Sequence, residues 1–203
     1  MDRRELSLLI KDYFPESALD YVTNQIISLN FKLIISKKRF SRLGVFRPSK
    51  NNNKPVISIN YDLDKNLFFI VYLHEVAHLM VWNNYKKRTA PHGREWKEQY
   101  RKILIEALNK NLFPEETKES IINSLTRPNF HKNLQKKFSD SSIENSNLTR
   151  VKNLPENCIF TLCNGRSFKI IRKIRTRYKC QDVKNGKYYL VNSQAEVTSY
   201  STL

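Results

Sequence analysis

Cysteine is scarce in this chain, and its three cysteines form no CxxC pair. Cys158, Cys163 and Cys180 therefore cannot supply the four thiolates of a zinc ribbon, so we predict no structural zinc site in the C-terminal part. The small, odd number also argues against a disulfide framework. We expect a protein of a reducing compartment, the cytoplasm.

The chain also has no uninterrupted apolar stretch of membrane-spanning length. Its longest apolar stretch, residues 67–82, is interrupted by His74, Glu75 and His78. The first residues, MDRRELSLLIKDYF, include acidic side chains, and no small-residue cleavage site follows them. We therefore expect neither a signal peptide nor a membrane partner. A length of 203 residues suffices for one substantial core and a small appended module.

Acidic residues are few relative to basic ones. The sequence holds 36 lysines and arginines against 19 aspartates and glutamates, a formal net charge of +17. Residues 127–203 contain 15 of the basic residues and 5 of the acidic ones, so this part is the more basic per residue. Such a balance favours polyanionic partners, and we expect DNA to be one.

The segment from Phe69 to Tyr85 contains the pattern HExxH, formed by His74, Glu75 and His78. Two histidines four residues apart lie on one face of a helix, so both imidazoles can reach one metal ion. The carboxylate between them points to neighbouring space, where it can take a proton from water. This arrangement is typical of a zinc peptidase with Glu75 as the general base.

The surroundings of this motif strengthen the interpretation. Nearly every other residue of 67–82 is apolar, which predicts a helix buried on most sides. An imidazole or carboxylate buried there without a partner costs on the order of several kcal/mol, whereas shared coordination of a divalent cation satisfies all three groups. The alternative is structural, with two core histidines bonded to backbone carbonyls and a glutamate at the surface.

A catalytic zinc site needs a third protein ligand, and only two other histidines are present. His92 is the better candidate, because it lies between Pro91 and Gly93 directly before the helical pattern of residues 95–108. A ligand in such a loop can fold back onto the first helix. The basic residues around His131 instead indicate a solvated or phosphate-contacting side chain.

Two alternatives for the third ligand stay open. Glu95 or Glu98 on the second helix could bind the metal in place of His92, or His92 could be a solvated loop residue. The metzincin pattern is excluded, because Val81 and Asn84 occupy the positions where that pattern requires glycine and histidine.

With HEVAH at 74–78 and HGREW at 92–96, the chain resembles the SprT-like family of metallopeptidases, which includes the Spartan proteases. The segments 39–44 and 56–60 are similar to that family's strand pair. The resemblance covers roughly residues 1–126. It implies zinc-dependent cleavage of proteins held on DNA, with one zinc ion bound by three histidines and a glutamate as general base, at His74, His78, His92 and Glu75.

The fold class that we predict is α+β. A zincin-like metallopeptidase domain with a small antiparallel sheet is expected over residues 1–126, followed by a polar linker over 127–150. Residues 151–203 are expected to form a basic, antiparallel β meander, similar to a zinc ribbon that has lost its cysteine ligands.

Periodicity supports several elements of the first domain. Apolar residues recur at helical spacing over 3–14 and 16–29. Residues 31–36 and 56–60 have strand-like patterns and are separated by a basic loop, which suggests an antiparallel pair. Either 42–47 or 56–60 could receive a substrate backbone by strand addition, or both could be purely structural.

The C-terminal part carries two strong hairpin-turn dipeptides, Asn164-Gly165 and Asn185-Gly186. They divide residues 158–197 into three predicted strands. Alternate residues of the middle strand are basic, which predicts one cationic face that contacts phosphates, with nearby tyrosines stacking on bases. The alternative is an ordinary solvated strand face. The predicted nucleic-acid contacts are Lys169, Lys173, Arg175, Arg177 and Lys179.

The leading hypothesis is therefore a zinc-dependent endopeptidase that acts on proteins bound or crosslinked to DNA. A second hypothesis is a nucleic-acid-binding protein whose metal site is structural or residual, and a third is a zinc hydrolase for a non-peptide bond. Tyr85, Tyr100 and Arg94 lie close enough in sequence to stabilise an oxyanion, but the sequence does not choose among them.

Overall fold

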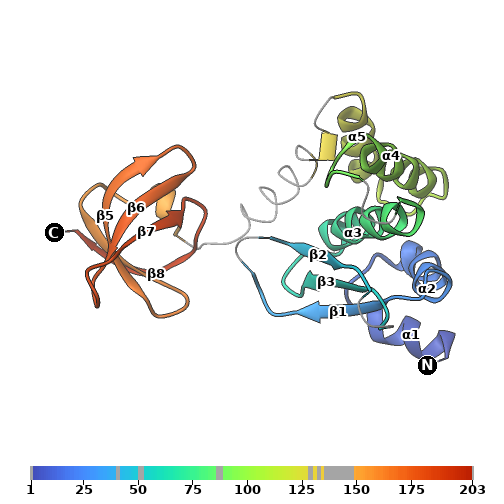
Figure 1. Ribbon diagram of the computed structural model, residues 1–203, viewed down its shortest axis with the longest axis horizontal. Helices are drawn as coiled ribbons and strands as arrows, with labels where there is room; N and C mark the ends of the chain where they lie inside the picture. The colour runs from blue at the N-terminus through green and yellow to red at the C-terminus, as the bar shows by residue number, and fades with distance from the viewer. Residues whose placement is uncertain are drawn as a thin grey trace. The chain divides into compact units, whose positions relative to one another are not determined.

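The computed structural model describes residues 2–39, 42–49, 53–85, 89–127, 130–131, 134 and 149–202. The chain forms two compact units, Met1–Ile143 and Glu144–Leu203, which are described separately (Figure 1). Most of the predicted linker, 127–150, lies outside the described residues. Among the helices described, none has the length and apolar content needed to cross a membrane.

The first unit contains the predicted helices. At the start of the first helix, Asp2 and Glu5 form a capping box, which satisfies backbone amides that have no partner within the helix. Asp64 accepts hydrogen bonds from the amides of Asn66 and Leu67 and so begins the third helix. The helices are α1 (Arg3–Ile10), α2 (Leu19–Ser28), α3 (Lys65–Tyr85), α4 (Arg94–Asn109) and α5 (Glu115–Leu125), with a 3-10 turn over Glu16–Ala18.

Helix α3 is the centre of the first unit. Its sequence is apolar on nearly every side, and its side chains from Leu67 to Ala77 are all buried. Figure 1 shows α3 between the small sheet on one side and α4 on the other. A helix enclosed in this way holds its polar side chains in fixed positions, because neighbouring groups leave them little room to move.

The sheet of the first unit has three strands, β1 (Lys32–Ser36), β2 (Gly44–Arg47) and β3 (Val56–Asn60), in the order β1-β3-β2. β1 pairs with β3 in parallel and β2 pairs with β3 antiparallel. The predicted antiparallel pairing of 31–36 with 56–60 is therefore wrong. The chain reverses twice between these segments, because β2 lies between them in the sequence. β3 is the central strand, which leaves β2 as an edge strand.

The second unit is a five-stranded antiparallel sheet with the order β7-β6-β5-β4-β8. Both asparagine-glycine turns are confirmed, with Gly165 and Gly186 at positive φ. Its small core includes Cys158, Phe160 and Cys180. The strands are β4 (Cys158–Leu162), β5 (Ser167–Ile174), β6 (Arg177–Asp182), β7 (Tyr188–Asn192) and β8 (Val197–Thr202), preceded by a 3-10 turn over Val151–Asn153.

The predicted middle strand of this unit is in fact two strands. β5 and β6 are joined by a tight turn at Arg175 and Thr176, in which Arg175 has φ 49°. A non-glycine residue rarely adopts this left-handed backbone conformation. This turn could not be predicted from the sequence, because the turn contains no glycine, asparagine or proline.

Candidate metal centre

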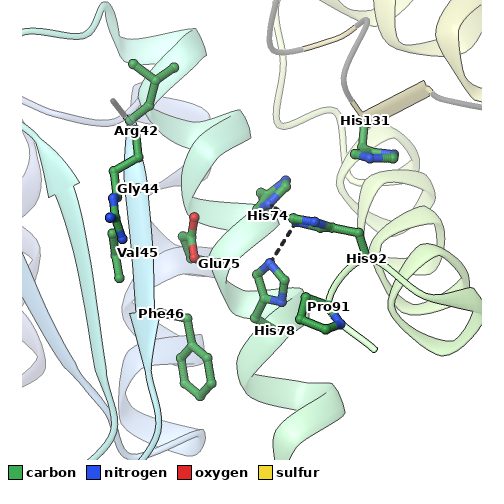
Figure 2. Close-up of a pocket in the computed structure, with 11 residues that line it drawn as sticks. Arg42, Gly44, Val45, Phe46, His74, Glu75, His78, Pro91, His92 and His131 are labelled. Atoms are coloured by element: carbon green, nitrogen blue, oxygen red, sulfur yellow. Dashed lines mark hydrogen bonds between the residues drawn. The ribbon is translucent and has the colours of Figure 1, made fainter. Parts of the chain in front are cut away.

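Helix α3 positions three polar side chains at the centre of the first unit. His74 and His78 are one helical turn apart and project to the same side, while Glu75 projects toward β2 (Figure 2). His74 and Glu75 are both buried, with 5% and 6% of their surface exposed. The HExxH residues of the apolar helix α3 thus face one shared pocket.

His92 completes the cluster from the loop before α4. Its Nε2 atom lies 3.0 Å from Nε2 of His74 and 3.1 Å from Nε2 of His78. Of all the described acidic, cysteine and histidine residues, these three histidines form the group that could hold a metal ion. The proposed alternatives, Glu95 and Glu98, are not part of it, and Glu98 instead forms an exposed ion pair with Arg94.

The donor set fits a divalent transition metal. Tetrahedral zinc with Zn–N bonds of about 2.0–2.1 Å separates its nitrogen ligands by roughly 3.3 Å, close to the distances observed here. Burial, together with the neighbouring imidazoles, lowers the pKa of His74 well below its usual range. Burial and His92 lower the pKa of His78 to about 4. The two imidazoles are therefore neutral near pH 7, which is the form that binds metal.

Trp96 forms an aromatic wall of the cluster. Its ring lies 4.5 Å from the ring of His74, 5.1 Å from that of His78 and 4.5 Å from that of His92, measured between centroids. Tyr100, one helical turn further along α4, packs on Trp96 and His74. The apolar stripe of α4 therefore serves both the core and the metal centre.

His131 lies beside this cluster, and the prediction of a solvated side chain is wrong. Only 3% of its surface is exposed. Its ring stacks on that of His92, with centroids 5.4 Å apart and an angle of 18° between the planes. The neighbouring Phe130 and Leu134 are both buried, and this pair of apolar residues at helical spacing was the signal that the basic residues obscured.

The cluster opens into a pocket of about 610 Å³. One wall is the edge strand β2 with its preceding residues, and the opposite wall is formed by Pro91, His92 and His131 (Figure 2). Glu75 lies between the two walls. A ligand in this pocket would contact the strand, the carboxylate and the imidazoles together.

Glu75 makes its closest contacts with β2. The backbone amide of Phe46 donates a hydrogen bond to its carboxylate. A Cβ atom on Gly44 would lie 2.7 Å from Oε1 of Glu75 and 2.7 Å from Cγ1 of Val71, so only glycine permits this approach. Burial raises the pKa of Glu75 to about 7, although the Phe46 amide and Arg39 oppose the shift. A carboxylate with this pKa can accept and return a proton near neutral pH.

A polar network holds β2 in place beside Glu75. Arg39 donates hydrogen bonds to the side-chain oxygen of Asn60, at 2.8 Å, and to the carbonyl of Ser58, at 2.9 Å. The side chain of Asn60, which is buried, donates in turn to the carbonyl of Arg39. These bonds tie the segment before β2 to the central strand.

The suggested oxyanion-stabilising residues do not line the pocket. The hydroxyl of Tyr100 is buried and donates to the carbonyl of Ile70 at 3.4 Å. Arg94 pairs with Glu98, and Tyr85 is exposed at the end of α3. Arg42 does line the pocket and, among the described residues, is the lysine or arginine that does so.

The predicted cationic face of the second unit is only partly formed. A bulge between Ile170 and Arg172 changes which side chains of β5 point to each face of the sheet. Lys173 therefore pairs with Tyr178 and lies on the opposite face from Lys169 and Lys179. Arg175 lies in the turn. Three of the five predicted residues share one face, and Arg172, opposite Lys179, joins them. The three are Lys169, Arg177 and Lys179.

Comparison with known proteins identifies the family of the first unit. The sequence model of the SprT-like family matches residues 14–119, which is more than half of the chain. Protein SprT of Enterobacter sp. (strain 638) is 38% identical over 52 residues, covering 20% of this chain and 31% of that relative, so the chain spans less than a third of the relative's length. No solved structure matches the chain. The chain belongs to the SprT-like family.

Proposed function

We propose that this chain is a zinc-dependent endopeptidase whose substrates are proteins bound or crosslinked to DNA. The observation that carries the proposal is the convergence of three imidazole Nε2 atoms beside a buried carboxylate, in a pocket bordered by an edge strand. His74, His78 and His92 would hold the metal. This combination of a motif helix and an adjacent edge strand supports a zincin-like domain.

The protein groups supply the proton transfers. When bound, zinc acts as a Lewis acid toward the scissile carbonyl and lowers the pKa of water. Glu75 accepts a proton from the attacking water through its carboxylate and returns it to the nitrogen of the leaving amine. The raised pKa of Glu75, about 7, suits both steps, because neither protonation state is strongly favoured.

The edge strand supplies the binding site for an extended peptide. The amide of Asn60 donates to the carbonyl of Leu43, which fixes the alternation of hydrogen bonds between β2 and β3. By that alternation, the backbone groups of Gly44 and Phe46 face away from β3. A substrate backbone could pair by strand addition with the amide and carbonyl of Gly44 and with the carbonyl of Phe46, because the Phe46 amide already donates to Glu75. The pocket thus favours a polymer over a small molecule.

The second unit supports DNA as the partner. Its cationic face carries half-buried and exposed lysine and arginine side chains beside Tyr188. The Nζ atom of Lys179 lies 4.5 Å from the centroid of the Tyr188 ring, and Tyr188 is 58% exposed. Arg175 and Lys173 add exposed charge at the hairpin tip. Lysine and arginine bind phosphates, and an exposed aromatic ring can stack on an unpaired base.

The central test combines metal analysis with cleavage. We expect one zinc per purified chain, and Glu75→Gln should keep the zinc while losing cleavage of a basic protein crosslinked to an oligonucleotide. Cleavage by that variant at the wild-type rate would refute the proposed role of Glu75. Fluorescein-labelled casein, with and without single-stranded DNA, serves as an unfolded probe that requires no knowledge of the natural substrate.

A nucleic-acid-binding protein with a structural or residual metal site is the second candidate, and the cationic face of the second unit favours it. Fluorescence anisotropy with a labelled oligonucleotide separates the two. Salt-dependent binding without cleavage of any crosslinked protein, in a chain that contains zinc, would select this second function.

A further inference from the structure

His92 differs from the other two histidines in how it is held. His74 and His78 belong to a long helix that is buried along most of its length. His92 lies in a loop, and its backbone has φ 58°, a left-handed conformation that is uncommon for residues other than glycine. Such conformations persist where the surrounding structure enforces them. The orientation of the His92 ring therefore depends on what packs around it.

Two aromatic rings enclose His92 from different directions. Trp96 meets it edge-on, at 4.5 Å and an angle of 86°, and His131 stacks on it, at 5.4 Å and 18°. Figure 2 shows the ring of His131 above that of His92, on the side away from His78. The edge-on contact with Trp96 limits tilting of the imidazole, and the stacking of His131 limits its rotation. Together they direct Nε2 toward His74 and His78.

The position of His131 is itself firmly fixed. Its neighbour Phe130 is 1% exposed and stacks on Tyr100, with centroids 5.6 Å apart and an angle of 19°. His131 also meets Trp96 edge-on at 5.2 Å. Tyr100 and Trp96 both belong to α4, so the same helix supports the two rings that confine His92. The segment that carries His131 lies beyond the region matched to the family, residues 14–119.

We propose that His131 is a positioning residue for the third metal ligand, acting by stacking on the ring of His92. The inference rests on the proposed metal site. The role is one of shape, because the contact that His131 makes with His92 is between the faces of the two rings. Loss of groups that orient a ligand typically lowers metal affinity about 10–100-fold.

The test measures zinc affinity by competition with a chromophoric chelator, for His131→Phe and His131→Ala in the full chain. His131→Phe keeps a ring and should bind zinc within about threefold of wild type, whereas His131→Ala should bind at least about tenfold more weakly. The absorption spectrum of the Co²⁺-loaded chain should change in the alanine variant alone. Near-UV circular dichroism and melting of the metal-free variants show whether each has folded.

A background variant isolates the path of the effect. In His92→Ala, which has lost the ligand, adding His131→Ala should cause no further loss of zinc affinity. Wild-type affinity in His131→Ala would overturn the inference, as would equal losses in the alanine and phenylalanine variants, or a loss that persists in the His92→Ala background. A wild-type chain that binds no zinc would overturn the proposed function as well, so the two failures are distinguishable.

Discussion

Gly44→Ala should separate the position of the base from the binding of metal. The added Cβ would lie 2.7 Å from Oε1 of Glu75, 2.9 Å from its Cγ and 2.7 Å from Cγ1 of Val71. Non-bonded carbon atoms prefer about 3.5–4.0 Å, so these neighbours must move by roughly 1 Å. Val71 is fully buried, whereas Glu75 lines the pocket, so the carboxylate of Glu75 is the group that must be displaced.

The expected size of the effect follows from that displacement. Misplacing a reacting group by about 1 Å costs roughly 10²-fold in rate, and overpacking a buried site costs about 1–3 kcal/mol of folding free energy. We therefore expect kcat for labelled casein to fall about 10²-fold in Gly44→Ala. The zinc content should remain at one per chain, because the three atoms nearest to the added Cβ belong to Glu75 and Val71 and not to an imidazole.

Two further variants control for stability. Gly165→Ala makes the same substitution where nothing lies within 4 Å of the added Cβ, at φ 78°, so the second unit should lose stability and kcat should stay unchanged. Adding Val71→Ala to Gly44→Ala removes the clash with Val71 and leaves the two clashes with Glu75. It should restore part of the melting temperature without restoring kcat. A Gly44→Ala variant with wild-type kcat and zinc would refute the assigned role of the glycine.

Three other predictions address the metal and the second unit. Zinc added at about 1,000 times its dissociation constant should stabilise the metal-free first unit by about 4 kcal/mol, seen as a higher melting temperature that a chelator reverses. Arg175→Ala with Arg177→Ala should reduce the slope of log affinity against log salt by roughly 0.7–0.9 for each lost phosphate contact, while labelled casein is cleaved as before. Arg166 donates a hydrogen bond to Asp182 at 2.6 Å and holds the pKa of that carboxyl below its usual range. The stabilisation from this ion pair is present at neutral pH and is lost as pH falls through the lowered pKa. Asp182→Asn should therefore melt at a lower temperature than wild type at pH 7 and lose this part of the acid sensitivity.

The sequence predicted the parts of the first unit that depend on local pattern. The apolar run around HExxH predicted α3, and the spacing of Trp96 and Tyr100 predicted α4. These signals are local, because each element buries the face that its own periodicity defines. The approach of His92 to α3 was anticipated from its position in a loop between these two helices.

The features that the sequence did not predict depend on distant partners. Whether two strands run parallel depends on how many times the chain reverses between them. Residues 42–47 were a candidate strand, but their pairing with β3, which decides the orientation of β1 and β3, is not visible in the sequence. The need for glycine at 44 exists only because β2 meets α3. The bulge after Ile170 similarly reflects pairing with β6, and it moved Lys173 off the predicted face.

The two sides of the pocket are held in place by different kinds of interaction. The position of the Glu75 carboxylate is fixed by backbone contacts, since the Phe46 amide and the absence of a Cβ atom at Gly44 define where this carboxylate can lie. The third imidazole is set by the aromatic side chains of Trp96 and His131. Because these supports share no residue, changes at β2 should act on proton transfer, while changes around His131 should act on metal affinity. A site built this way can be tuned in one property without loss of the other.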